Sequence, residues 1–74
     1  MTLDKVKELL AEHLDMEISE ITEETTFEDL GVDSLDTVEI LMEMEDEFGI
    51  TITPNEVGKS VKELVEYIEK KKDE

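Results

Sequence analysis

Ser34 is the residue whose place in the sequence best suits a chemical role. It follows Gly31 and Asp33 at a turn that leads into a predicted helix. A helix N-terminus presents free N–H groups and the positive end of the helix dipole, which would stabilise a phosphate ester on a serine at this position. Serine and aspartate are also common N-cap residues. The sequence alone therefore leaves two interpretations of Ser34, a modification site or a structural cap, and Asp33 is an equal candidate for the cap.

Other residues offer little catalytic chemistry. His13 is the only histidine, and no nucleophile or orienting partner stands at a spacing that would make it a general base, so we expect a structural or surface residue. The chain has no cysteine, which excludes disulfides, thiolate metal ligands and a cysteine nucleophile. Asp29, Asp33 and Asp36 do not follow the ligand pattern of a calcium loop and suggest at most loose cation binding. We predict neither an enzyme nor a metal site.

Three segments repeat apolar residues at helical spacing and are predicted to form the main helices. They cover residues 3–14, 35–48 and 61–68. The last begins at a capping box of Ser60 and Glu63 and is expected to fray into the lysines at 70–72.

A shorter helix and a long loop complete the predicted fold. Residues 53–56 read as a second capping box with Pro54 at the first helical position, and Gly58 ends this short helix. Residues 15–33 show no sustained period and are predicted to form a loop held down by apolar anchors. The anchors are Ile18, Ile21, Phe27 and Leu30. We therefore predict an all-α fold, a small bundle of three main helices and one short helix, in a single domain covering residues 1–74.

The predicted helix at 35–48 has two apolar faces. At about 100° per residue, one group of side chains forms a core face. This group is Ile40, Leu41, Met44 and Phe48. The second group lies nearly opposite and consists of Leu35, Val38 and Met42, which we call the apolar strip. A small bundle cannot bury both faces of one helix, so we expect the strip to be at least partly exposed.

Acidic residues border the apolar strip on both sides. On one side are Asp36, Glu39, Glu43, Asp46 and Glu47, and Glu45 lies on the other. An apolar strip with a charged rim is typical of protein interaction sites, in which apolar anchors supply affinity and charges steer the encounter. The alternatives are that the strip covers a loop, such as the long loop, or another helix, and that the acids form a solvated face.

The charge of the chain narrows the class of partner. Its 74 residues include 23 acids and 7 lysines, for a formal charge of −16, and all seven lysines lie outside residues 8–58. Nucleic acids and anionic lipids require basic clusters, so we expect a basic protein surface or a divalent cation instead.

No apolar run is long enough to span a membrane and the N-terminus lacks a signal-peptide layout, which predicts a cytoplasmic protein. We expect it to be a monomer.

Residues 27–39, with the sequence FEDLGVDSLDTVE, resemble the acyl carrier proteins of bacterial fatty acid synthesis. The resemblance extends over essentially the whole chain, including the EDEF sequence at 45–48 and both terminal helices. It implies that Ser34 carries phosphopantetheine through a phosphodiester and that the terminal thiol of this arm holds acyl groups as thioesters. It also implies that Asp33 presents Ser34 to the holo-acyl-carrier-protein synthase and coordinates the metal ion of that enzyme.

The resemblance assigns two further sets of residues. A surface read by basic patches on fatty acid synthesis enzymes would consist of Leu35, Asp36, Val38, Glu39, Met42, Glu45 and Asp46. An interior pocket that shelters acyl chains would be lined by Phe27, Ile40, Leu41, Met44, Phe48, Ile52 and Leu64. The segment 54–61 is shorter than in many fatty acid carriers, which keeps open a carrier for a polyketide or another dedicated acyl pathway. From a different class, an acidic interaction or mimic protein that binds a basic partner surface is the remaining alternative.

Overall fold

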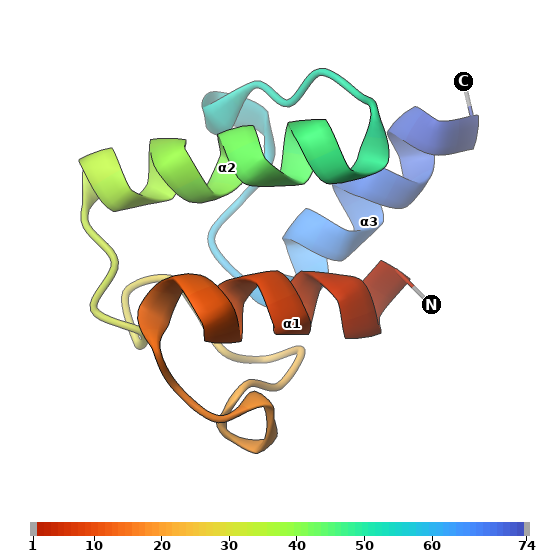
Figure 1. Ribbon diagram of the computed structural model, residues 1–74. Helices are drawn as coiled ribbons and strands as arrows, with labels where there is room; N and C mark the ends of the chain where they lie inside the picture. The colour runs from red at the N-terminus through yellow and green to blue at the C-terminus, as the bar shows by residue number, and fades with distance from the viewer. Residues whose placement is uncertain (1, 74) are drawn as a thin grey trace.

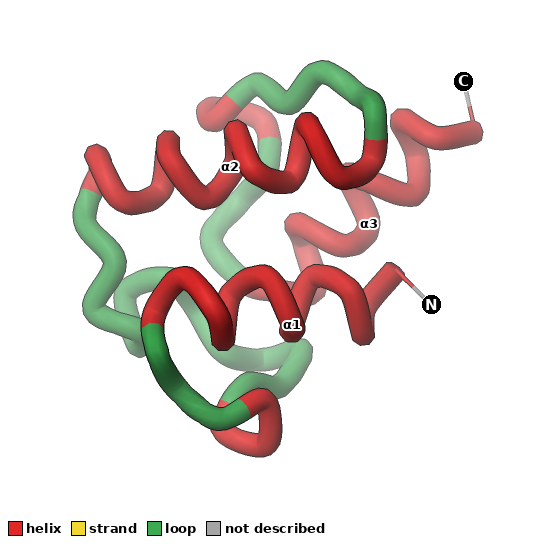
Figure 2. The backbone as a smooth tube through the Cα atoms, in the orientation of Figure 1, coloured by secondary structure: helices red, strands yellow, loops and turns green. Residues whose placement is uncertain are grey.

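The computed structural model describes residues 2–73, and this part of the chain folds into helices joined by loops. The elements are α1 (Thr2–Leu14), η1 (Ile18–Glu20), α2 (Ser34–Phe48), η2 (Pro54–Glu56) and α3 (Val61–Asp73). Helices α1 and α2 run side by side, α3 crosses behind them, and α1 contacts both (Figure 1). Helices and loops account for the whole tube, apart from one isolated β-bridge between Thr26 and Ser60 within residues 2–73 (Figure 2). The predicted all-α bundle is confirmed.

Half of the predicted capping box at the start of α3 is present. The Ser60 hydroxyl oxygen accepts the N–H of Glu63 at 3.2 Å. The Glu63 carboxylate accepts the Ser60 O–H at 3.2 Å and the N–H of Lys59 at 3.4 Å, and not the backbone N–H of Ser60. The predicted fraying at the lysines is wrong, because α3 continues through them to Asp73. Lysines suit the negative end of a helix dipole, and Lys72 also lies 5.5 Å from the centre of the Phe48 ring.

The predicted short helix is present, but its capping box is not. The N–H of Glu56 donates to the backbone carbonyl of Thr53 at 2.9 Å, and the Thr53 side chain makes no cap bond. The Glu56 carboxylate instead accepts the Tyr67 hydroxyl at 3.2 Å. The Glu56 side chain, which the local pattern assigned to the cap, therefore bonds to Tyr67 of α3 instead.

The long loop is anchored by three of its four predicted residues. Ile21 and Phe27 are buried and Leu30 is half-buried, whereas Ile18 is 45% exposed, so its prediction as an anchor is wrong. Ile18 begins the unpredicted turn η1, in which the N–H of Glu17 donates to the Glu20 carboxylate at 3.0 Å.

Backbone hydrogen bonds tie this loop to the start of α3. The N–H of Phe27 donates to the carbonyl of Lys59 at 3.0 Å, and the N–H of Val61 donates to the carbonyl of Thr25 at 2.9 Å. The N–H of Lys62 donates to the carbonyl of Glu23 at 3.0 Å. The loop thus satisfies N–H groups that the first turn of α3 leaves unpaired. We call this group of bonds the loop strap.

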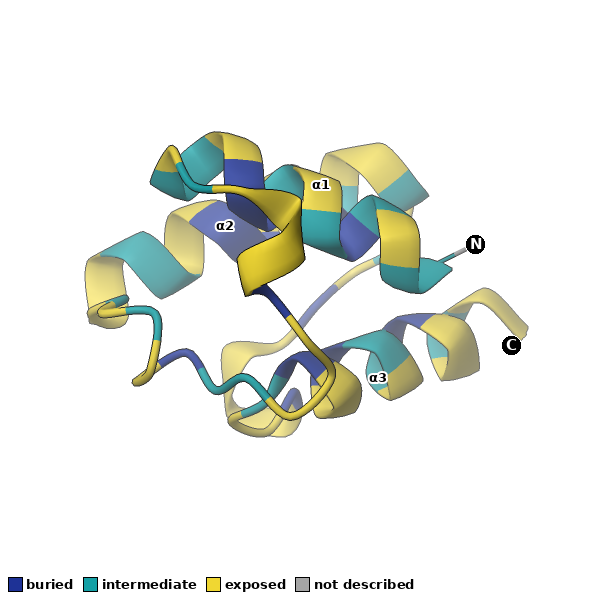
Figure 3. Cartoon of the chain, turned by 90° about the horizontal axis from the view of Figure 1, so that it is seen from below, coloured by how far each residue is buried: buried dark blue, intermediate teal, exposed yellow. Residues whose placement is uncertain are grey.

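One hydrophobic core joins all three helices and both loops. Its buried residues lie where the elements face one another (Figure 3). They are Val6, Leu10, Ala11, Ile21, Phe27, Ile40, Leu41, Met44, Ile52, Val57, Val61, Leu64 and Ile68. Within residues 2–73, no helix has the length and apolar character needed to cross a membrane.

Candidate functional site

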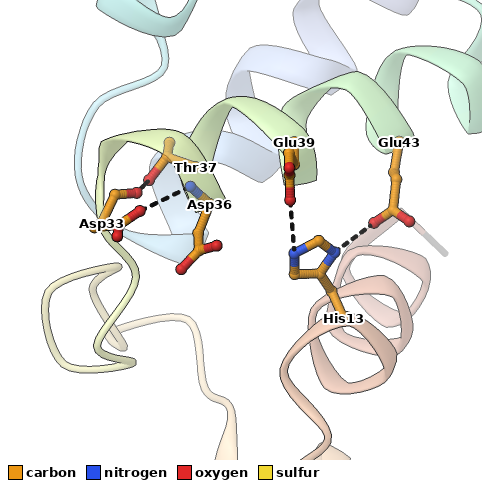
Figure 4. A network of polar contacts seen from close by, with 6 residues as sticks. All are labelled: His13, Asp33, Asp36, Thr37, Glu39 and Glu43. Atoms are coloured by element: carbon orange, nitrogen blue, oxygen red, sulfur yellow. Dashed lines mark hydrogen bonds and ion pairs between the residues drawn. The ribbon is translucent and has the colours of Figure 1, made fainter.

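The N-terminus of α2 is capped by Asp33. Its Oδ1 accepts the N–H of Asp36 at 2.9 Å, and its backbone carbonyl accepts the N–H of Thr37 at 2.9 Å and the Thr37 hydroxyl at 2.8 Å (Figure 4). Asp33 has extended backbone angles, as an N-cap residue requires. The structure therefore decides between the two residues that the sequence left as equal candidates for the cap.

Ser34 is the first residue of α2 and is exposed. Its hydroxyl takes no part in the hydrogen bonds found among residues 2–73. The side chain is therefore open to an incoming enzyme at a helix N-terminus, where a phosphodiester is favoured by the dipole. This geometry fits the covalent attachment of a phosphopantetheine group, and no rearrangement of the cap is needed.

The apolar strip on α2 is exposed, as predicted. Leu35 is 77% exposed, Val38 43% and Met42 58%. The opposite face of the same helix is buried through Ile40, Leu41 and Met44. The alternative in which the strip covers the long loop is therefore wrong, because that loop packs elsewhere, against the start of α3.

The predicted acidic docking residues differ in their surroundings. Glu39 and Asp46 are exposed and Asp36 is half-buried. Glu45 is also half-buried, and its Oε2 accepts the N–H of Ile52 at 2.7 Å. This bond fastens the chain that follows α2 to the last turns of the helix. Glu45 thus has an internal role that its position beside the strip did not indicate.

The sequence did not indicate that His13 lies beside the acidic rim. It projects from α1 toward α2, with Nδ1 3.1 Å from Glu43 Oε2 and Nε2 3.8 Å from Glu39 Oε2 (Figure 4). The i to i+4 spacing of Glu39 and Glu43 marks them as neighbours on one helix face. Only the packing of α1 on α2 brings the histidine between them.

The residues predicted to line an acyl pocket lie in the core. Six of them are buried and Phe48 is half-buried. A surface hollow of about 250 Å³ lies beside one of them, Phe27, and close to the first turn of α2. Its lining consists of Thr26, Phe27, Glu28, Thr37, Gly58 and Lys59.

Comparison with known proteins identifies the class to which this site belongs. The model of a protein family described as a phosphopantetheine attachment site matches residues 4–68. Acyl carrier proteins of Streptococcus pyogenes serotypes M3 and M1 are each 46% identical to the chain over 68 residues, which are 92% of this chain and 92% of each relative. The crystal structure of an acyl carrier protein from Thermotoga maritima has a TM-score of 0.78 and 34% identity, and the match covers 93% of this chain and 84% of that one.

The chain therefore belongs to the acyl carrier protein family. The predicted cofactor, phosphopantetheine, is confirmed by the family match, and so is the prediction of a carrier protein that is not an enzyme.

Proposed function

We propose that this chain is a single acyl carrier domain whose phosphopantetheine arm is attached to Ser34. The observation that carries the proposal is that Asp33, and not Ser34, caps α2. Asp33 caps the helix, while the exposed Ser34 hydroxyl stands beside it at the positive end of the dipole. The need for a cap does not account for the serine, whereas the need for a nucleophilic hydroxyl does.

The residues around Ser34 suit the attachment reaction and the attached group. The arm supplies a thiol that holds acyl groups as thioesters. One carboxylate oxygen of Asp33 accepts the N–H of Asp36, and the residue is exposed. Its second carboxylate oxygen can therefore coordinate the metal ion of a holo-acyl-carrier-protein synthase. Leu35, the first residue of the apolar strip, follows Ser34 directly in the sequence. The strip therefore begins beside the proposed attachment site.

The core is the proposed shelter for acyl chains. The hollow beside Phe27 is lined by Thr37, one turn after Ser34, and by Phe27, which is itself one of the predicted pocket residues. Met44 belongs to that core and is fully buried. A flexible thioether side chain adapts to irregular volumes, so Met44 suits an interior that must repack around chains of different length.

The proposed partners are enzymes of fatty acid synthesis with basic docking patches, including the holo-synthase. The apolar strip supplies anchors, and the exposed acids Glu39 and Asp46 supply a field complementary to such patches. We propose that the chain meets them as a cytoplasmic monomer. The limitation of η2 to Pro54–Glu56 also suits a carrier for a dedicated acyl pathway, and the trapping of partner enzymes on a reactive arm would distinguish the two pathways.

The attachment is tested by mass spectrometry after incubation with coenzyme A and a phosphopantetheinyl transferase. We expect the mass to increase by one phosphopantetheine group, and the increase to be lost in Ser34→Ala. Ser19→Ala is the matched control, since Ser19 is an exposed serine of η1 and its loss should leave modification intact. A wild-type chain that stays unmodified, or a Ser34→Ala chain that still gains the mass, would refute attachment at Ser34.

A further inference from the structure

His13 is held in one orientation against α2. Its side chain is 20% exposed, and Glu43 Oε2 lies 3.1 Å from Nδ1, within hydrogen-bonding distance. In the tautomer that carries its proton on Nδ1, Glu43 accepts that proton and Nε2 turns its lone pair toward Glu39. The Nε2 to Glu39 Oε2 distance of 3.8 Å is too long for a direct hydrogen bond. Two electron-pair donors therefore face each other with a gap between them.

A second carboxylate faces the same gap. Asp36 lies one turn before Glu39, and its carboxylate is on the Nε2 side of the ring (Figure 4). One ligand atom each from His13, Asp36 and Glu39 can be chosen so that all three lie within 4.8 Å of one another. The side chains of Asp36 and Glu39 make no bond that holds the fold among residues 2–73, apart from the contact of Glu39 with His13. They are therefore able to move toward a shared ion.

The donor set suits a divalent transition metal. Zn²⁺ binds imidazole nitrogen at about 2.0–2.1 Å and carboxylate oxygen at about 2.0–2.2 Å, which places tetrahedral ligand atoms about 3.3 Å apart. The three ligand atoms would therefore need to approach one another by up to about 1.5 Å. Water would complete the coordination. A histidine that ligates zinc commonly donates its other N–H to a carboxylate, and Glu43 already occupies that position. The imidazole also distinguishes this cluster from the purely acidic surface around it, because Mg²⁺ and Ca²⁺ prefer oxygen ligands.

We propose that His13, Asp36 and Glu39 form a binding site for Zn²⁺ or a similar transition-metal ion, with Glu43 orienting the imidazole. The sequence contains one histidine and predicted no metal site, since the carboxylates are far from it along the chain. The packing of α1 on α2 brings the ligands together. The net charge of −16 favours the entry of any cation, and the imidazole nitrogen supplies the selectivity.

The test is calorimetric titration of the full chain with ZnCl₂, with 10 mM Mg²⁺ present to occupy the general acidic surface. We expect one Zn²⁺ per chain to bind, and proton and carbon NMR signals of the His13 ring to shift at that stoichiometry. His13→Gln should weaken binding by at least about tenfold, because it removes the nitrogen ligand. Glu43→Gln should weaken binding by about 10-fold to 100-fold while leaving all three ligands present.

Controls separate this site from the diffuse attraction of an acidic protein. Glu39→Gln removes one charge and one ligand, whereas Glu24→Gln removes the same charge from the exposed loop and should leave Zn²⁺ affinity within about twofold. If His13→Gln unfolds the chain, Asp36→Asn gives the same test, since the cap uses only the backbone N–H of Asp36. Equal Zn²⁺ affinity in the ligand variants and in Glu24→Gln would overturn the proposal. A complete loss of Zn²⁺ binding in the presence of Mg²⁺ would also overturn it.

Discussion

Asp33 holds the first turn of α2 through both its carboxylate and its carbonyl, so the cap of this helix does not depend on Ser34. Aspartate and serine have similar preferences for the N-cap position, and no local pattern could rank them. The backbone angles identify the cap, because Asp33 is extended and Ser34 is the first helical residue of α2. The remaining hydroxyl is the one that we propose for modification.

The contribution of the Asp33 cap can be measured in the unmodified chain. We expect Asp33→Ala to lower the free energy of unfolding by about 0.5–2 kcal/mol, because the N–H of Asp36 loses its acceptor. Asp33→Asn keeps an acceptor oxygen and should stay close to the wild type. Urea denaturation monitored by circular dichroism gives both values. An Asn variant as unstable as the Ala variant would mean that the charge, and not the hydrogen bond, stabilises the helix start.

Helix α2 has opposite apolar faces, and its sequence predicted this arrangement because helical periodicity assigns each residue to a face. The prediction succeeded for Leu35 and Met44, which depend on that geometry alone. It was incomplete for Glu45, whose carboxylate turns toward the N–H of Ile52. That contact depends on the path of the chain after Gly49, where a left-handed conformation (φ +66°) ends the helix. A local pattern carries no information about that path.

The exposed face of α2 makes a kinetic prediction about docking. Glu39→Lys should slow association with a basic-patch partner by about threefold to tenfold at low salt, because it reverses a charge in the steering field. Stopped-flow measurements at several salt concentrations would test this, and the effect should shrink as screening increases. Glu69→Lys makes the same charge change at an exposed position on α3 and is the matched control. An equal slowing by both variants would indicate net charge instead of a docking face.

At the scale of the whole molecule, local patterns predicted the three helices, their buried faces and most loop anchors. Contacts between segments distant in sequence were not predictable in this way. His13 meets Glu39 and Glu43 only through the packing of α1 on α2. The turn η1 was missed for a different reason, because it is too short to show an apolar period. It is closed by a local bond between the Glu17 N–H and the Glu20 carboxylate.

The charge balance of the molecule predicts sensitivity to salt. Residues 8–58 contain 17 acids and no lysine, so like charges repel across most of the fold. Screening that relieves about 1 kcal/mol of this repulsion should raise the Tm by about 4–8 °C in a domain of this size. We expect the Tm to rise with NaCl, and to rise at lower concentrations with MgCl₂. A Tm that is insensitive to both salts, measured by scanning calorimetry, would contradict a destabilising charge field.

The loop strap has a consequence for the timing of the proposed carrier cycle. The hollow beside the first turn of α2 is lined by Phe27 and Lys59, the same residues that share a backbone hydrogen bond of the strap. An acyl chain that entered by this route would pass between two segments already fastened to each other. The residence time of the acyl chain would then depend on how often the loop strap opens. A partner enzyme that weakened the loop strap on docking would release the acyl chain at that enzyme.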